Sequence, residues 1–508
     1  MNVRDAVLAR IAGLAPSARR SLELLSCTPE PIGPALLGAL DVSRTTVGVL
    51  AATGLVDRHG KGVAFRHEIA RAAVLEATAP GAEPELHATM IDALEAVGGD
   101  PSLLAHHATA SGDVPRILRY APEAAAEAAR SGAHREAVAF YETALRHVGD
   151  DPATRAALLE ALSVELDLTD RLHAAVAAQE QALELRRATG DVAAVGAAHT
   201  ALAGFAWGAA DRALAERHVA AAIEILSSTD DRRALGFALA RQSFLAAWRG
   251  DAPQARRSGG RAARIADELD DVVLRTSASI GVALVRLLEG DLQGRTDLLA
   301  ATDVGLAHRI DGLVTPPMTN VCHFDVEQGR FAEAEESLVE ALRLSEQRDT
   351  PSCTAWQLGV RARLRLLQGR WAEAEQDAHA VLRSGDLPLG QLWPHLVLGL
   401  LAARREGPPV NPNLDGCGGW SPRSTSPAWS RRPSPRWPRT PGSPVAPTRG
   451  STDPSPRTCS RSPSPAGTSR WHRCGAGCAV SPRPGSSRSG RRRRPWFRPR
   501  RTSPTSGR

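Results

Sequence analysis

Between about residue 100 and residue 405 the sequence repeats a unit of about forty residues, and this period constrains the fold more than any other feature. Each unit contains an apolar helical pattern that ends at a glycine, and a second helical pattern follows. The glycines that mark the period are Gly132, Gly208, Gly250, Gly290, Gly329 and Gly369, with spacings of 76, 42, 40, 39 and 40 residues. The first interval is nearly two periods. The clearest copies read GRFAEA from Gly329 and GRWAEA from Gly369.

This unit has a simple physical explanation. Glycine adopts the left-handed conformation that ends a helix, the aromatic residue fills the elbow, and small alanines let two paired helices approach closely. Helix pairs of this kind stack side by side and form a solenoid. We therefore predict an α-solenoid of the tetratricopeptide type, with about seven repeats between Leu118 and Arg405. The repeats nearest Thr169 and Asp291 are expected to be the least regular.

The first 95 residues follow a different pattern, in which short helices precede two short strands. Ser43 is of the residue type that caps helix N-termini. The expected elements are helices at residues 5–14, 17–26, 34–40 and 44–54, and strands at 55–59 and 63–66 around a Gly60-Lys61-Gly62 turn. Helices followed by a two-stranded wing predict a winged-helix module.

From Cys417 to Arg508 the composition changes completely. This segment contains 20 Arg and 17 Pro, no Leu, Ile or Lys, and one acidic residue, Asp453. So few large aliphatic side chains cannot offset the entropy of ordering the backbone. We predict a winged-helix arm at 1–95, tetratricopeptide-like helical repeats at 96–405, and a disordered Arg/Pro/Ser-rich tail at 406–508. The expected fold class is all-α.

The same break divides the charge and leaves two interpretations of the tail open. The tail carries a net charge of +19 and the whole chain +6, so residues 1–416 carry −13. Lys61 is the single lysine against 61 arginines, which indicates a GC-rich gene. A GC-rich frame read out of register yields Arg, Pro, Ser, Gly and Ala, so the tail reads as a frameshifted sequence. Alternatively, arginines 491–494 beside Trp496 and Phe497 form a nucleic-acid-binding arm.

Two stretches resemble large actinobacterial LuxR-type regulators, which are relatives of the maltose-regulator class of signal-transduction ATPases. LVDRHGKGVAFRHEIARAAVLEA, from Leu55 to Ala77, is similar to the winged-helix segment that follows their nucleotide-binding domain. LAHHATASGDVPRILRYAPEAAAEAARSGAHREAVAFYETAL, from Leu104 to Leu145, is similar to the start of their helical repeats. The resemblance covers about residues 4–416.

The resemblance implies an arm and a sensor. Full-length members carry an ATPase domain before the winged helix and a LuxR-type helix-turn-helix at the C-terminus, and neither can be read in this sequence. We therefore expect the middle portion of a transcriptional regulator. The alternative is a stand-alone repeat scaffold whose basic tail binds nucleic acid. A one- or two-base shift near codon 416 that restores a frame ending in a helix-turn-helix would exclude this alternative.

The concave face of the predicted solenoid is the expected binding surface, and the first helix of each pair builds most of it. Candidate ligand-binding residues there are Trp207, Arg241, Arg286, Asn320 and His323. Packing or a solvated position is the alternative for each of them. The expected partner is an effector peptide, a protein or a small molecule. DNA binding is expected only through the domains missing here, because the acidic body next to the basic wing argues against a strong non-specific affinity for DNA.

The sequence predicts no enzyme and no cofactor. A Walker phosphate loop needs a lysine in a glycine-rich loop after a strand, but Lys61 lies in the wing turn, so we expect no ATP to bind in this chain. We also expect no metal site, and we interpret His106 and His107 as packing residues of a helix.

Cysteine usage and hydropathy predict a cytoplasmic protein. Cys27, Cys322 and Cys353 are isolated, as buried thiols in a reducing compartment are. The sequence shows no signal peptide and no apolar run of about 20 residues, so no membrane contact is expected.

Limited proteolysis tests the predicted organisation. The repeats bury their backbone and the tail does not, so a protease should leave a protected fragment that ends near residue 405. Mass spectrometry of the fragment gives its C-terminus. Uniform resistance through residue 508 would contradict the predicted boundary.

Overall fold

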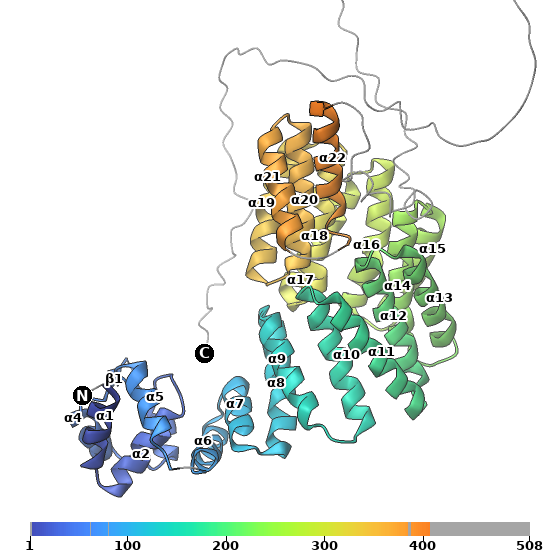
Figure 1. Ribbon diagram of the computed structural model, residues 1–508. Coiled ribbons are helices and arrows are strands. Elements are labelled where there is room, and N and C mark those ends of the chain that lie inside the picture. Colours follow the sequence, from blue (N-terminus) through green and yellow to red (C-terminus); the bar gives the residue numbers. More distant parts are fainter. Residues whose placement is uncertain (1–2, 61, 80, 385–387, 407–508) are drawn as a thin grey trace, which may run out of the picture. The chain divides into compact units, whose positions relative to one another are not determined.

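The computed structural model describes residues 3–60, 62–79, 81–384 and 388–406, and these residues are almost entirely helical (Figure 1). Their single sheet has two strands. The all-α class is therefore confirmed, with a small winged-helix module followed by a tetratricopeptide-like solenoid. No helix in the described ranges combines the length and the apolar character of a membrane span. Lys61 and residues 407–508, which include nearly all of the predicted tail, lie outside the described residues.

The winged-helix module has the expected order of elements. They are α1 (Val3–Ala12), α2 (Pro16–Ser26), α3 (Pro34–Ala39), α4 (Arg44–Ala52), β1 (Val56–His59), β2 (Gly62–Phe65) and α5 (Glu68–Glu76). Ser43 caps α4 as predicted, because its hydroxyl accepts a hydrogen bond of 3.0 Å from the backbone N–H of Thr46. The two strands pair antiparallel, and Ile32 adds a bridge to Val63 that the sequence pattern did not indicate.

Two helices connect the module to the repeats. These are α6 (Glu83–Val97), which contacts α2 and α3, and α7 (Pro101–Ser111), which packs against α6. Gly98 ends α6 in the left-handed conformation, and the Asp100 carboxylate caps α7 through the N–H of Ser102. The predicted division at residue 95 falls within the last turn of α6.

Seven helix pairs and one further helix follow in the part of the chain that the structure describes. The first helices are α8 (Val114–Ser131), α10 (Pro152–Leu168), α12 (Val192–Gly208), α14 (Arg232–Arg249), α16 (Val272–Glu289), α18 (Asp311–Glu327) and α20 (Pro351–Leu367). The second helices are α9 (His134–His147), α11 (Leu172–Thr189), α13 (Arg212–Leu226), α15 (Ala252–Glu268), α17 (Gln293–His308), α19 (Phe331–Gln347) and α21 (Trp371–Ser384), and α22 (Leu392–Glu406) ends the described array.

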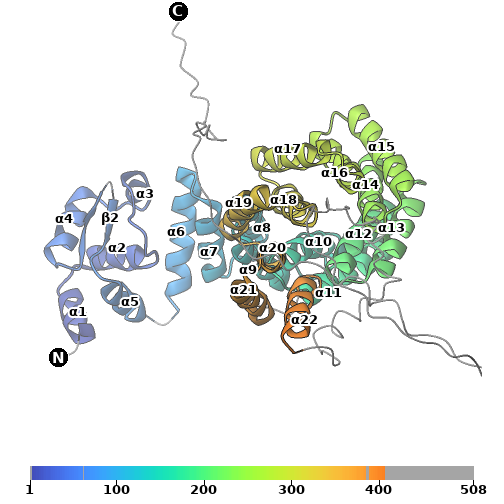
Figure 2. The same cartoon turned by 90° about the horizontal axis from the view of Figure 1, so that it is seen from above.

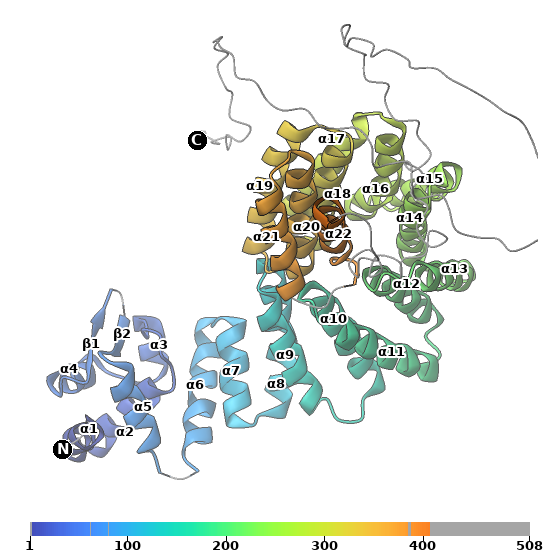
Figure 3. The same cartoon turned by 45° about the horizontal axis from the view of Figure 1, so that its top comes forward.

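The first helices form an inner layer. From α12 to α22, each first helix contacts the next first helix directly as well as its own partner, and Figure 3 shows the second helices on the outside of the curve. The inner helices α14 and α16 approach each other closely at Gly281 of α16. A Cβ atom placed there would lie 2.6 Å from the carbonyl carbon of Ser243 and 2.8 Å from the backbone nitrogen of Phe244 on α14. Only a residue without a side chain fits this contact.

The turns between helices use glycine together with aspartate. Gly132, Gly250, Gly290, Gly329 and Gly369 have positive φ angles after a first helix, as predicted. Aspartates cap many of the next helices by accepting N–H groups of the first turn. These caps are Asp113, Asp151, Asp191, Asp211, Asp231, Asp251 and Asp271.

Gly208 does not make the predicted left-handed turn. It is the last residue of α12, and Ala210 takes the positive φ angle of 62° two residues later. In the long interval before it, Asp170 has a φ angle of 66° and makes the turn between α10 and α11. Both turns therefore exist without a glycine, which explains why the glycine spacing misses one period.

The array curves until its first pair contacts its later pairs. His134, at the start of α9, is buried with Nδ1 2.7 Å from Glu165 of α10 and Nε2 3.3 Å from Asp311 of α18. Arg348, which ends α19, pairs with the same Asp311. In Figures 1 and 3, α9 lies next to the end of the α18–α19 pair. We call His134, Glu165, Asp311 and Arg348 the closing tetrad.

Charge balance explains why these groups are buried together. Burial by itself lowers the pKa of His134, but the carboxylates of Asp311 and Glu165 outweigh this effect and raise the pKa to about 9. His134 is therefore protonated at neutral pH. Two cations then face two carboxylates, so no buried charge lacks a counter-charge.

Replacing Gly281 by alanine should destabilise the protein. The added methyl group collides with the backbone of α14, and overpacking of this kind costs about 1–3 kcal/mol. The matched control is Gly260→Ala in α15, where a Cβ atom would meet nothing within 4 Å. The free energy of unfolding of this control should rise by up to about 1 kcal/mol, because alanine favours the helix more than glycine does. Thermal unfolding followed by circular dichroism compares the two, and equal midpoints would contradict the close packing.

The closing tetrad should make stability depend on pH. Because the pKa of His134 is raised from 6.5 to about 9, its contribution is complete below about pH 6.5 and is lost as the pH rises through 9. A shift of this size corresponds to about 3 kcal/mol. The measurement is the difference in thermal midpoint between wild type and His134→Gln at pH 6.5 and pH 9.5. This difference should shrink at the higher pH.

An exposed histidine provides the control for this effect. His308→Gln should behave as wild type at both pH values, because His308 lies exposed at the end of α17. The thermal midpoint of wild type could instead exceed that of His134→Gln by the same amount at pH 6.5 and pH 9.5. This result would show that the tetrad does not hold a protonated histidine.

Candidate functional site on the inner helices

An aromatic cluster connects inner helices that are far apart in the sequence. We call it the inner aromatic cluster; its members are Trp207 (α12), Phe244 and Trp248 (α14), His323 and Phe324 (α18), Trp356 (α20) and Trp393 (α22). Successive ring centroids lie between 5.1 and 6.5 Å apart, the range of favourable aromatic pairs. Trp207, Phe244, Trp248 and Trp356 remain half-buried, so solvent reaches part of the cluster.

Several buried polar atoms of this cluster have no hydrogen-bond partner within the described ranges. They are both ring nitrogens of His323 and the indole Nε1 atoms of Trp248 and Trp393. His323 is 3% exposed, and its ring centroid lies 5.4 Å from those of both tryptophans. An unpaired buried polar group costs about 1–3 kcal/mol. Such groups concentrated at one place mark a site where a ligand or ordered water can supply the missing partners.

The chemistry of His323 suits hydrogen bonding rather than charge pairing. Burial lowers the pKa of its imidazole to about 4, although Glu327 opposes this shift. The ring is therefore neutral at pH 7, with one N–H donor and one nitrogen acceptor. Together with the indole N–H groups, it offers donors and an acceptor inside an apolar surround.

Two opposite charges lie beside the first ring of the cluster. The Asp167 carboxylate of α10 lies beside Gly208 of α12, and the guanidinium group of Arg241 of α14 lies beside Gly204. Burial raises the pKa of Asp167 to about 6, and Arg241 opposes the shift. Neither side chain makes an ion pair within 4.0 Å among the described residues, and both stay partly exposed. The Arg241 guanidinium also lies 6.0 Å from the Phe244 ring centroid.

The Asp167 carboxylate also acts on a residue that is distant in the sequence. Burial raises the pKa of the Cys353 thiol on α20, and the Asp167 carboxylate on α10 adds to the shift. The two residues are 186 positions apart.

The five residues predicted from the sequence all lie on first helices, but they have different environments. Trp207 belongs to the inner aromatic cluster and Arg241 lies beside it. His323 lies inside the cluster, so a ligand reaches it only by displacing neighbouring rings. Arg286 pairs with Asp297 of α17, and the Asn320 amide donates 2.9 Å to the backbone carbonyl of Pro316. The last two therefore have partners of their own.

The sequence prediction omitted most of the cluster. Phe244 and Trp248 are four residues apart on one helix, and this spacing places them on one face. Trp356 and Trp393 also lie on first helices. An inventory of all aromatic residues on first helices would have found these four. Asp167 carries no comparable signal, because only the closure of the array shows its surroundings.

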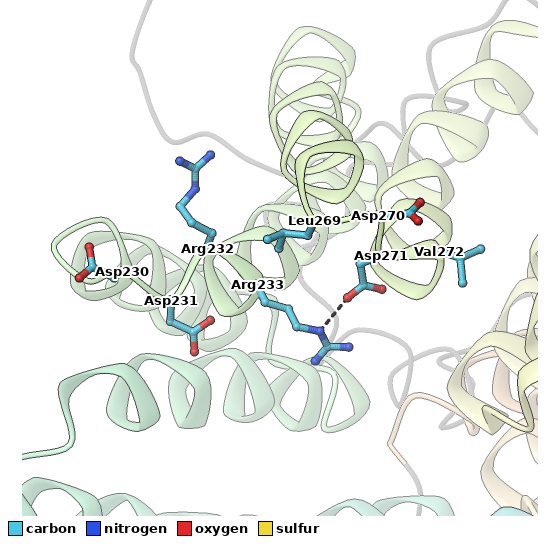
Figure 4. A pocket seen from close by; sticks show the side chains of 8 residues that line it. All are labelled: Asp230, Asp231, Arg232, Arg233, Leu269, Asp270, Asp271 and Val272. Carbon is cyan, nitrogen blue, oxygen red and sulfur yellow. Dashed lines mark hydrogen bonds and ion pairs between the residues drawn. The ribbon is translucent and has the colours of Figure 1, made fainter.

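A hollow lies at the turns before α14 and α16 and has a volume of about 610 Å³ (Figure 4). Most of its charged residues already have partners. Asp231 and Asp271 are helix caps, the Arg233 Nε atom lies 2.7 Å from Asp271, and Arg232 lies 2.7 Å from Glu268. The hollow is open to solvent and contains no unpaired buried group among these residues. The inner aromatic cluster is therefore the stronger candidate.

One group of described residues has ligand atoms close enough for a metal ion. It consists of His87, His106 and His107 on α6 and α7, whose ligand atoms all lie within 4.8 Å of one another. The sequence placed only the adjacent pair together, and the hairpin of α6 and α7 adds the third imidazole.

Comparisons with known proteins give structural similarity only. No protein-family model and no curated protein matches the sequence. A signal-transduction ATPase with numerous domains and a tetratricopeptide-repeat sensor, from Pyrococcus horikoshii, matches 80% of this chain at 16% identity with a TM-score of 0.42. A Rap protein complexed with competence and sporulation factor matches 75% at 11% identity with a TM-score of 0.44.

The extent of these matches differs between the two proteins. The match covers 97% of the Rap protein but 62% of the ATPase, so the chain spans less than two thirds of that ATPase. With both TM-scores below 0.5, neither likeness decides the fold or the function of this chain.

Proposed function

We propose that this chain is the arm and sensor region of a LuxR-type transcriptional regulator, and that the inner aromatic cluster binds a peptide effector. The observation that carries the binding proposal is the set of unpaired buried polar atoms of Trp248, His323 and Trp393 within an aromatic surround. The order of winged-helix module and helical repeats supports the assignment to a regulator, because the resembled family has the same order.

The chemistry of the cluster matches a peptide. Half-buried aromatic faces bind apolar side chains, and aromatic residues are enriched at the centres of protein–peptide contacts. The indole N–H groups have no acceptor within the site, and they can donate to the carbonyl groups of a peptide. Asp167 and Arg241 lie beside Trp207 and can bind an ammonium and a carboxylate group of the same peptide.

We also propose that the chain is not an enzyme. Asp167 lies beside Gly208 at the end of α12, and its pKa of about 6 would suit a general base. However, Cys353 cannot serve as its nucleophile partner, since burial raises the pKa of that thiol rather than lowering it. A binding role accounts for the same residues without a reaction.

Peptides selected from a random library displayed on phage test the binding proposal. Peptides that bind the full chain should lose at least ten-fold in affinity against Trp207→Leu, because truncating an aromatic hot spot typically costs about 2 kcal/mol. Arg241→Gln should weaken those selected peptides that carry a carboxylate facing the site. Fluorescence anisotropy of labelled peptides measures both effects.

Trp371→Leu is the matched control. Trp371 lies on α21, a second helix, where it is 40% exposed and 6.0 Å from the guanidinium of Arg404. Its replacement removes an exposed tryptophan from the outer layer and should leave peptide affinity unchanged. Selected peptides that bind Trp207→Leu as tightly as wild type, or a library that yields no binder, would contradict the proposal.

A further inference from the structure

Three imidazoles converge where α6 and α7 pack against each other. His87 and His107 are 3% and 1% exposed, and their Nδ1 atoms lie 2.7 Å apart. His106 is exposed, and its ring centroid lies 5.6 Å from that of His87 and 5.0 Å from that of His107. Figures 2 and 3 show α6 and α7 side by side over their length. The third imidazole thus lies at the solvent side of a buried pair.

A histidine pair alone needs no metal, as a second pair in the same chain shows. His199 of α12 and His218 of α13 also share a hydrogen bond, with their Nδ1 atoms 2.9 Å apart. In each pair one neutral ring donates its Nδ1 proton and the other ring accepts it, so both Nδ1 atoms have a hydrogen-bond partner without a metal ion. The described residues place no third metal-ligating side chain at that pair. His106 is what distinguishes the group on α6 and α7.

The geometry of the three-histidine group is close to that of a metal site. Zinc binds histidine nitrogens at about 2.0–2.1 Å, so two nitrogens of a tetrahedral site lie about 3.3 Å apart. The three candidate nitrogens all lie within 4.8 Å of one another. Shifts of about one ångström, through rotation of the rings, would bring them to a common ion.

We propose that His87, His106 and His107 bind a divalent transition-metal ion of the kind that imidazole prefers, with Zn²⁺ as the expected ion. The fourth position is left to water; the Glu83 carboxylate lies 3.9 Å from the Nε2 atom of His87 but is not one of the groups within 4.8 Å of all the others. Three protein nitrogens and one open position match the donor sets of zinc sites.

The charges around the group permit a cation. Arg71 is the cation whose charge acts on His106. Its guanidinium is already engaged, because it donates to the Glu68 carboxylate and to the Ser26 carbonyl. Imidazole binds a metal ion in its neutral form, so no further positive charge has to be accommodated from the three rings.

A bound ion would cross-link the two helices between the winged-helix module and the repeats. α6 contacts the module through α2 and α3, and α7 contacts the first repeat helix α8. An ion held by both helices fixes their relative position without any contribution from the inner aromatic cluster. The metal proposal is therefore independent of the peptide proposal.

Titration of the metal-free full chain with Co²⁺, followed by visible absorption, tests the site. One equivalent of Co²⁺ should produce the intense visible absorption bands of a low-symmetry site. Added Zn²⁺ should displace the Co²⁺ and remove these bands. His106→Gln should weaken Zn²⁺ binding at least ten-fold, since loss of even an outer-sphere partner typically costs about 10–100-fold. His106 is exposed, so this variant should fold even if His107→Gln does not.

The control is His199→Gln, which disrupts the second histidine pair and should leave the Co²⁺ spectrum and the Zn²⁺ affinity unchanged. Zn²⁺ should also raise the thermal midpoint of wild type and of His199→Gln, but not that of His106→Gln. No stoichiometric Co²⁺ spectrum, or a His106→Gln variant with wild-type affinity, would overturn the proposal.

Discussion

The arrangement of the inner helices depends on the closing tetrad. A buried carboxylate or guanidinium without a counter-charge is costly, so His134, Glu165, Asp311 and Arg348 are stable only when all four meet. They come from α9, α10, α18 and the end of α19, and their meeting fixes the first repeats against the later ones. The Asp167 carboxylate on α10 also contributes to the raised pKa of the Cys353 thiol on α20, after the effect of burial. A ligand bound between the first and the later repeats therefore contacts helices that are far apart in the sequence.

Features that depend on local sequence could be predicted, and features that depend on closure could not. Ser43 caps α4 and five of the six repeat glycines make left-handed turns, because caps and turns require particular residues at particular positions. Gly208 misled the prediction, since Ala210 made the turn instead. The tetrad joins residues as far apart as His134 and Arg348, and no period in the sequence relates them.

The candidate site shows the same limit at the level of single residues. A helical period assigns a residue to a first helix, but it does not give the direction of the side chain after packing. Arg286 therefore pairs with α17 and Asn320 bonds its own helix, whereas Trp207 and Arg241 face the inner aromatic cluster. His323 lies in the right place but is covered by rings from α14, α20 and α22. Only the assembled inner layer decides between these cases.

The position of the cluster relative to the tetrad determines what a peptide could signal. A ligand shifts a conformational equilibrium only by the difference in its affinity for the two states. The inner aromatic cluster joins α12 and α14 to α18, α20 and α22, and α18 also carries Asp311 of the tetrad. If the proposed peptide inserts between Trp248 and His323, it would open the array only to the extent that it binds the opened array more tightly than the closed one. Since α9 belongs to the first repeat, opening at Asp311 would release the end of the array that leads through α8 and α7 to the winged-helix module.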